Sequence, residues 1–567
     1  MSLLVDGHPI NGPDQRGDLL SQKLAPSADR LTEYGATATA TLAQVGVEID
    51  QPIRDVYRTY YDPETCEVHV ESDITLADLE AETPPDEMAQ LRREAKESEG
   101  KTMIRINATP AGGGVVIINK AWVHKMRLLG IDAHWYSLPE NKEASKVTKW
   151  KFHNVMQAVS EPDVRLTEED KGVYNGWMKD SIKILADPIR NADVIIVDDW
   201  QPSGLIPYIK GDEETPGLNP NAPLFFRDHI HTRGDLMVKD GTPQNDSWRF
   251  LWDHNRIKEA DVFITHPKHE FVPPNVPNEM VAFMPATADL SDDLNRDLTE
   301  REIDSGFTFI NTELANNENQ TPLDLNRPYI VLIARFDESK GMPQGIESYA
   351  KTRQKMIDMG VAEADLPQFV VLGNGSVDDP SGDMMLEEIM DLRGLTKELD
   401  PAKYGNITED LKVIRVPHND VAINALLKGA KVALQPSIAE GFESRVTDAI
   451  LQGVPVIGSD RGGIPLQIID GESGYIIDPD DTEQWANRIT ELLTDEVQYD
   501  TMAKRTKELA VEHNYQFTTV RNLISWLHLA RTVAHKKSQQ ERFVGNRRWV
   551  SEMAIVARTL ELEARAA

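Results

Sequence analysis

Cysteine is almost absent from this sequence: Cys66 is the one cysteine among 567 residues. A single thiol excludes a disulfide within the chain and a zinc site built on cysteines, and it fits a reducing cytoplasm. Long apolar runs are lacking as well, because no window approaches the ~18 uninterrupted apolar residues of a membrane helix. The opening stretch, MSLLVDGHPINGPDQRGD, has no basic region followed by an apolar core, so we expect no signal peptide. These absences predict a cytoplasmic protein with no membrane partner.

Basic residues are few compared with acidic ones. Lys and Arg number 60 against 93 Asp and Glu, which gives a formal net charge of −33. The field of such a chain repels nucleic acid and anionic membranes, so neither is an expected partner. An acidic surface that favours solubility, or adaptation to salt, is the simplest explanation of the charge. An anionic ligand must then bind at a local basic site that opposes this field.

The length indicates more than one hydrophobic core, because single cores stop growing near ~250–300 residues. We expect an N-terminal extension over residues 1–100. From there, short apolar runs alternate with helical patterns over 101–315, and the same alternation restarts over 325–515. The helical segment 516–567 is expected to cross back to the first domain.

This alternation is typical of parallel sheets covered by helices on both faces. The predicted fold class is therefore α/β, with two facing doubly wound, Rossmann-like domains and a cleft between them. Ligands of open α/β sheets bind beyond the carboxyl ends of the strands. We therefore expect the chemistry in loops that directly follow strands.

The first such loop is NATPAGGGV, residues 107–115, between a predicted strand and a predicted helix. Gly112, Gly113 and Gly114 would let backbone N–H groups approach an anion at the start of the helix. The spacing is not that of a dinucleotide site. A tight turn without a ligand is the alternative.

The second is ARFDESKG, residues 334–341. Arg335 and Lys340, five positions apart after a buried strand, are suited to clamp a phosphate, the first through its planar fork and the second as a point charge. The alternative is a pair of solvated charges neutralised by Asp337 and Glu338.

Histidines and carboxylates follow two further strands. FFRDHIHTR ends a strand with His229 and His231, but no third ligand has metal-site spacing, so we expect no metal. His229 would contact a substrate there or form a structural hydrogen bond. VDDWQPSG provides Asp199 and Gln201, which suit sugar hydroxyls, although a plain polar loop is the simpler interpretation of these residues alone.

The stretch AEGFESRVTDAILQG, residues 439–453, combines a loop and a helix start. Helical spacing puts Glu440 and Asp448 about 12 Å apart along the axis. A glycosidase pair needs roughly 5–9.5 Å between its carboxyl groups, so the two do not act on one bond. They either contact two parts of one long ligand or stabilise the helix dipole.

Taken in order, the motifs resemble those of a known family. EGFE with an acid at 448 is similar to the E-x7-E signature of retaining glycosyltransferases with the GT-B fold (glycosyltransferase family 4 type), and ARFDESKG and ATPAGGGV resemble its phosphate clamp and glycine loop. GGGVVIINKAWVHKMRLLGIDAHWY, VTKWKFHNVMQ, VDDWQPSGLIP, FFRDHIHTRGDL, THPKHEFVPPNVP, FMPATAD, GNGSVDDP and EGFESRVTDAI resemble fungal-type retaining trehalose phosphorylases and, more loosely, trehalose synthases that use a nucleotide sugar. The resemblance covers about residues 101–550.

The resemblance implies a role for each matching residue. The catalytic set would be His229, Arg335, Lys340 and Glu440. Phosphate would bind to Gly113, Gly114, Arg335 and Lys340, the donor sugar to Glu440, Gly441, Phe442 and Glu443, and the acceptor sugar to Asp199 and Gln201. Asp448 is a departure, because the family usually has Glu there in contact with the ribose of a nucleotide.

The implied reaction is reversible phosphorolysis of α,α-trehalose to α-glucose 1-phosphate and glucose, without a cofactor or metal. The expected partners are therefore trehalose, glucose, phosphate and glucose 1-phosphate, with a homodimer as a further expectation. The alternative is a trehalose synthase that uses glucose and a nucleoside diphosphate (NDP) glucose, with Asp448 at the ribose.

Overall fold

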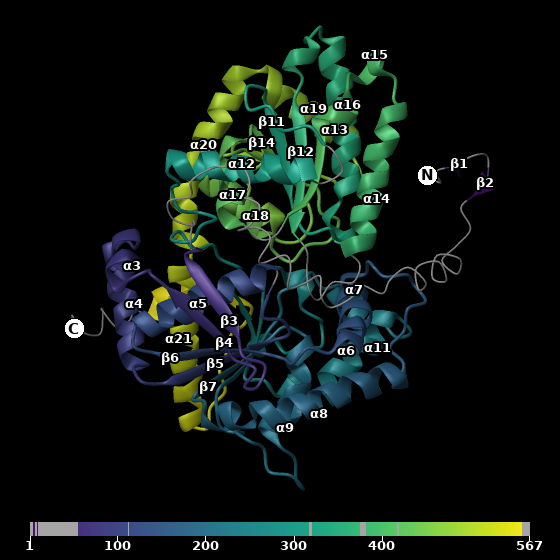
Figure 1. Ribbon diagram of the computed structural model, residues 1–567. Helices are drawn as coiled ribbons and strands as arrows, with labels where there is room; N and C mark the ends of the chain where they lie inside the picture. The colour runs from purple at the N-terminus through teal and green to yellow at the C-terminus, as the bar shows by residue number, and fades with distance from the viewer. Residues whose placement is uncertain are drawn as a thin grey trace. The chain divides into compact units, whose positions relative to one another are not determined.

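The computed structural model describes residues 4–5, 8–9, 55–111, 113–316, 320–374, 382–416 and 419–557. It divides into two units, Met1–Arg54 and Asp55–Ala567. In the first unit, the described part is an antiparallel pair, β1 (Leu4–Val5) and β2 (His8–Pro9). Both large sheets belong to the second unit (Figure 1).

In the described chain, the first sheet has seven strands, all parallel to their neighbours. Their order across the sheet is β17 (Arg548–Trp549), β10 (Val281–Phe283), β9 (Val262–Thr265), β8 (Leu224–Arg227), β7 (Val194–Asp198), β5 (Thr102–Asn107) and β6 (Asp132–Ser137). The helices of this part are α5 (Gly113–Leu128), α6 (Lys142–Val147), α7 (Asn154–Gln157), α8 (Glu168–Asn191), α9 (Ile206–Lys210), α10 (Gly234–Met237) and α11 (Pro243–Arg249), with a π-helical turn, η1 (Thr148–His153), between α6 and α7.

The second sheet is also parallel throughout. Its order is β13 (Leu411–Val416), β12 (Gln368–Asn374), β11 (Tyr329–Ile333), β14 (Val432–Gln435), β15 (Val456–Ser459) and β16 (Gly474–Ile477). The helices of this part are α12 (Glu300–Asn316), α13 (Met342–Asp358), α14 (Gly382–Leu395), α15 (Pro401–Tyr404), α16 (Ile407–Asp410), α17 (Asp420–Gly429), α18 (Ser444–Leu451), α19 (Thr482–Thr494) and α20 (Glu496–Gln516).

Alternate residues of a strand enter different cores. In β7, Ile195 and Val197 belong to one apolar cluster, whereas Val194 and Ile196 belong to another, and β11 divides in the same way. Successive side chains of a strand point to opposite faces. Each sheet therefore has an apolar core on both faces, which explains why its strands are continuous apolar runs.

In each sheet the strand that comes first in the chain lies inside the sheet, and later strands are added first on one side of it and then on the other. β5 lies between β6 and β7, and β11 lies between β12 and β14. Ligands of open α/β sheets bind at such switch points. The four loops that follow β5, β7, β11 and β14 are the glycine loop, VDDWQPSG, ARFDESKG and AEGFESR of the sequence.

Segments from both ends of the second unit pack on the first sheet. A hairpin of β3 (Tyr57–Tyr61) and β4 (Val68–Ser72) is followed by α3 (Leu76–Glu82) and α4 (Pro85–Glu97). Near the other end, α21 (Thr519–Ser538) packs against α4 and α5 (Figure 1), and β17 pairs with β10. None of the described helices is long and apolar enough to cross a membrane.

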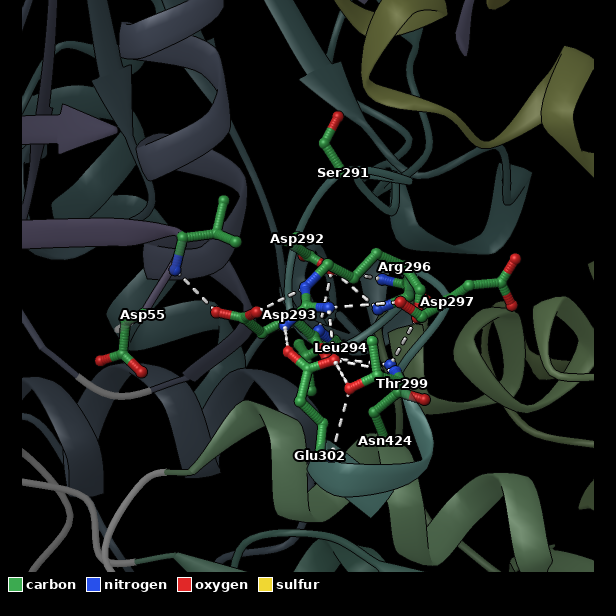
Figure 2. A network of polar contacts seen from close by, with 12 residues as sticks. Asp55, Ser291, Asp292, Asp293, Leu294, Arg296, Asp297, Thr299, Glu302 and Asn424 are labelled. Carbon is green, nitrogen blue, oxygen red and sulfur yellow. Dashed lines mark hydrogen bonds and ion pairs between the residues drawn. The ribbon is translucent and has the colours of Figure 1, made fainter. Parts of the chain in front are cut away.

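The segment from β10 to α12 links the two sheets and is held by polar contacts (Figure 2). Asn424 of α17 donates to the backbone oxygens of Asp293 and Arg296, at 2.9 Å each. The guanidinium of Arg296 in turn donates to Asp293 at 2.7 Å and to Glu302 at 2.5 Å. Hydrogen bonds between charged groups are the stronger kind, so this network fixes the path of the link.

Candidate active site

A cavity of about 240 Å³ lies between loops of the two sheets. One wall, the neutral wall, comes from the loops after β5, β7 and β8. The other, the charged wall, comes from the loops after β11 and β14. The predicted site residues that line it are Gly114, Asp199, Gln201, His229, Arg335, Lys340, Glu440, Gly441, Phe442 and Glu443. Gly113 is the first residue of α5 beside them, and Gly112 lies outside the described residues. Loops far apart in the sequence thus meet at one place.

Lys340 is the centre of the charged wall. It ends a short 3₁₀ turn, η7 (Glu338–Lys340), and its Nζ donates to Glu440 Oε2 at 2.5 Å and to Glu443 Oε2 at 2.7 Å. Burial disfavours the ammonium, but the two carboxylates outweigh it and raise the pKa of Lys340. One cation cannot offset two buried acids equally, so burial raises the pKa of Glu440, whereas Lys340 outweighs burial and lowers that of Glu443.

The loop that carries these acids is tightly shaped. A Cβ at Gly441 would approach the backbone oxygen of His229 to 2.2 Å, so only glycine permits this contact between the two walls. Glu443 has φ +65° although it is not glycine. Such a backbone costs about 1–3 kcal/mol and persists only where its surroundings hold it, here the ion pair with Lys340.

An ion pair joins the two walls. Lys149, in the π-helical turn η1, donates to Asp337 Oδ2 at 2.8 Å, and both side chains line the cavity. The Asp337 carboxylate also accepts from the backbone N–H and hydroxyl of Ser339. Burial would raise the pKa of Asp337, but Lys149 and Arg335 outweigh it and hold that pKa well below its ordinary value. Asp337 thus partly neutralises the cationic clamp before any ligand binds.

His229 is fixed from behind by a buried charge pair. Its Nε2 lies 2.7 Å from Asp198 Oδ1, and Arg105 Nη2 donates to both oxygens of Asp198 at 2.9 and 3.0 Å. Burial lowers the pKa of His229 in spite of Asp198. Since a carboxylate can only accept, the neutral ring carries its proton on Nε2 and keeps Nδ1 as an acceptor.

Neutral polar groups form the rest of this wall. Asp199 has φ +84°, and burial, followed by repulsion from Asp228, raises its pKa well above the ordinary value, which favours the neutral acid. Gln201 Oε1 and His266 Nδ1 are buried and have no hydrogen-bond partner within the described chain. Buried polar atoms are normally paired, so these atoms are suited to the hydroxyl groups of a ligand.

Asp448 is the predicted residue that the structure does not bring into the cavity. It is buried on α18, where its Oδ2 accepts from Arg445 Nη1 at 2.8 Å. Burial, only partly offset by Arg445, raises the pKa of Asp448 to about 6. Its carboxylate is therefore already engaged by its own helix.

The sequence reasoning missed Arg105 and Lys149 as members of the site. Arg105 interrupts an otherwise apolar strand, MIRIN, and this buried cation was the signal that could have revealed it. Lys149 gives no comparable signal, because its partner Asp337 is 188 residues away.

Two family models match the chain. The model described as the N-terminal domain of trehalose synthase matches residues 105–273, and the model of glycosyl transferases group 1 matches residues 315–509. The first region contains the loops of the neutral wall, and the second contains those of the charged wall.

Curated relatives extend these matches. The trehalose phosphorylase of Grifola frondosa is 37% identical over 432 residues, which are 75% of this chain and 56% of that protein. The chain thus spans little more than half the length of this relative. The trehalose synthase of Pyrococcus horikoshii is 30% identical over 402 residues, which are 71% of this chain and 84% of that protein.

Among solved structures, the alpha,alpha-trehalose-phosphate synthase (UDP-forming) of Burkholderia vietnamiensis has a TM-score of 0.56 at 12% identity, over 78% of this chain and 99% of that chain. The fold is the GT-B fold of glycosyltransferases, and the fold class predicted from the sequence is confirmed. Within that class, the chain belongs to the glycosyltransferase family that contains the trehalose synthases and trehalose phosphorylases. The resemblance stated from the motifs is confirmed as well.

Proposed function

We propose that this protein is a retaining glucosyltransferase that catalyses the reversible phosphorolysis of α,α-trehalose to α-glucose 1-phosphate and glucose. The observation that carries the proposal is the arrangement of one cavity, in which Arg335, Lys340 and Glu440 face Asp199 and Gln201. A cationic clamp beside a sugar-binding carboxylate suits a glycosyl phosphate, and the opposite neutral wall suits a second sugar.

Phosphate would bind to Arg335 and Lys340 and to the backbone amides at the start of α5, Gly113 and Gly114. The helix N-terminus adds a partial positive charge. In the resting site, Lys340 is occupied by Glu440 and Glu443. Phosphate must therefore share this ammonium with the two acids, and a proton on Glu440 would reduce the repulsion that it meets.

Glu440 and the backbone of Gly441, Phe442 and Glu443 would hold the transferred glucosyl ring, with His229 on its other side. A phosphate oxygen bonds to the anomeric carbon on the face from which glucose departs, and the α configuration is retained. The phosphate proton passes to the departing oxygen, so that no separate acid is needed. The clamp then stabilises the charge on the phosphate.

A trehalose synthase that uses an NDP-glucose is the second candidate. The Pyrococcus horikoshii relative, of which the chain covers 84%, favours it. A diphosphate would then occupy the same clamp. A cytoplasmic location belongs to the first proposal and the second alike, and the free thiol of Cys66 is compatible with it.

The test is a comparison of donors. The protein is incubated with trehalose and phosphate, and separately with glucose and a panel of nucleotide sugars, and glucose 1-phosphate and trehalose are measured. The proposal predicts glucose 1-phosphate in the first mixture. Turnover with nucleotide sugars alone would establish the synthase instead, and no turnover in any mixture would indicate a sugar-binding protein without activity.

A further inference from the structure

A second, smaller cavity of about 80 Å³, the inner cavity, shares the clamp residues Arg335 and Lys340 with the first. Arg335, Lys340 and Glu443 line both cavities. The remaining wall of the inner cavity is largely apolar and includes Ile117, Leu372 and Ile423. If the phosphate bound by Arg335 and Lys340 were esterified, its organic substituent would lie either in this inner cavity or in the larger cavity of about 240 Å³.

Arg445 is a charged residue in the wall of the inner cavity. It is the second residue of α18 and lines the inner cavity, whereas Asp448, three residues later, is not among the described residues that line either cavity. The 2.8 Å ion pair between the two covers the carboxylate with the guanidinium. The Asp448 side chain is 4% exposed and that of Arg445 15%. The Asp448 carboxylate thus lies behind the guanidinium of Arg445.

Several acids hold Arg445 in this position. Asp448, Asp420, Glu443 and Asp292 all favour its charged form against the cost of burial. Moving a guanidinium away from buried carboxylates leaves charges unpaired, which is strongly unfavourable. A ligand would have to displace Arg445 against this cost in order to reach Asp448.

A nucleoside needs more from the inner cavity than inorganic phosphate does. Its base requires apolar volume, and the neighbouring hydroxyls of its ribose are bound well by a carboxylate. The inner cavity has apolar walls, but Arg445 occupies the volume beside them and covers the carboxylate. We infer that Arg445 determines the donor class: it excludes a nucleoside and restricts the clamp to inorganic phosphate and glycosyl phosphates. This inference rests on the proposed phosphorolysis and names the residue that separates it from the synthase reaction.

The test measures equilibrium binding of UDP, ADP and inorganic phosphate by calorimetry, so that no turnover is required. Arg445→Ala opens the cavity and exposes Asp448. Arg445→Lys keeps the positive charge on a shorter side chain. Arg445→Ala/Asp448→Asn opens the cavity without the carboxylate. The matched control is Arg488→Ala on α19, because Arg488 pairs with Glu491 at the same helical spacing and the same 2.8 Å. Thermal unfolding establishes that each variant is folded.

We expect Arg445→Ala to bind UDP or ADP at least about tenfold more tightly than the wild type, since hydrogen bonds to a charged group change equilibria by about this much. The double variant should lose most of this gain, and Arg488→Ala should show none. If Arg445→Ala does not fold, Arg445→Lys carries the test, with a smaller gain in the same direction.

The inference is overturned if the folded Arg445 variants bind nucleoside diphosphates no better than Arg488→Ala does. It is also overturned if the wild type binds UDP or ADP as tightly as phosphate. A wild type that rejects nucleotides but does not convert trehalose and phosphate would overturn the proposed function and leave the role of Arg445 supported.

Discussion

The two walls of the cavity handle charge in opposite ways. On the wall of the second sheet, Lys340 is shared between two acids, Glu440 and Glu443, and burial raises the pKa of Glu440 so that its proton sets the local charge. On the wall of the first sheet, the Asp198 charge is paired with Arg105 behind the surface, and a neutral histidine faces the ligand. The cations Arg335 and Lys340 suit an anion when Glu440 carries a proton, and neutral donors and acceptors suit hydroxyl groups.

The difference also explains how a chain of net charge −33 can bind phosphate. Two of its cations, Arg335 and Lys340, lie together in one loop, ARFDESKG, at a switch point of the sheet. A third cation, Lys149, reaches this place from the other wall. Local geometry therefore overrides the global field within a few ångströms of the clamp.

The largest effect is expected when the charged wall loses its central cation. Lys340→Ala removes a phosphate contact and leaves two buried acids without a partner. Loss of one such contact costs about 10²–10³ in rate, so kcat/KM for phosphorolysis should fall by about 10³. Steady-state kinetics measure this. Lys355→Ala, which removes an exposed pair with Glu483, is the control, and equal activity of both variants would remove the clamp from the mechanism.

A smaller loss of activity is expected when the charge pair behind His229 on the neutral wall is broken. Asp198→Asn leaves Arg105 buried without a counter-charge and His229 without its fixed orientation. Misplacement of a substrate-positioning group costs about 10²-fold in kcat, and KM for phosphate should change much less. Asp193→Asn, at the residue before β7, is the control, because Asp193 pairs with Lys101 at the surface. A rise in KM for phosphate as large as the loss in kcat would show that the two walls do not act independently on phosphate and sugar.

Loss of the ion pair between the two walls should reduce activity less than a change in either wall. Lys149→Met removes the ion pair that spans the cavity, and Asp337 then attracts Arg335 alone. KM for phosphate should rise about tenfold, because a partly buried charge pair of this kind contributes of the order of one decade. Lys146→Met, whose pair with Glu143 is exposed, is the control. An unchanged KM would assign Lys149 to stability only.

The smallest effect is a dependence on pH. Burial, only partly offset by Lys340, raises the pKa of Glu440 to about 7. Glu440 is therefore protonated below that pH and repels an anion above it. Sulfate, whose charge is constant in this range, should inhibit about three- to tenfold more strongly at about pH 6 than at about pH 8. Glu440→Gln should flatten the profile, and an equally steep profile in that variant would place the titration elsewhere.

The sequence predicted the loops better than their contacts. Apolar runs and their spacing located β5, β7, β8, β11 and β14, and the loops after them contain the predicted residues of the cavity. The pair Arg105 and Asp198 was not predictable, because 93 residues separate its members and only the sheet brings them together. Lys149 was missed for the same reason.

Asp448 shows the limit of helical spacing as evidence. The predicted helical spacing began at Glu440, whereas α18 begins at Ser444, and the spacing could not reveal that Arg445, on the same face of α18, covers the Asp448 carboxylate. The role of Asp448 in nucleotide binding therefore stays a prediction, as do the boundaries at residues 100, 315 and 515. The structure does show that residues from Asp55 onward belong to the same unit as both sheets.

The most direct test of the account follows trehalose and inorganic phosphate with the purified protein by ³¹P and ¹H NMR. Phosphate in the sugar cavity should yield glucose 1-phosphate with the α configuration and an equal amount of glucose, in amounts that reverse when the products are supplied. The β anomer would contradict attack from the face of departure. No sugar phosphate at all, in a sample that makes trehalose from an NDP-glucose, would contradict the central claim that this clamp binds phosphate as the substrate.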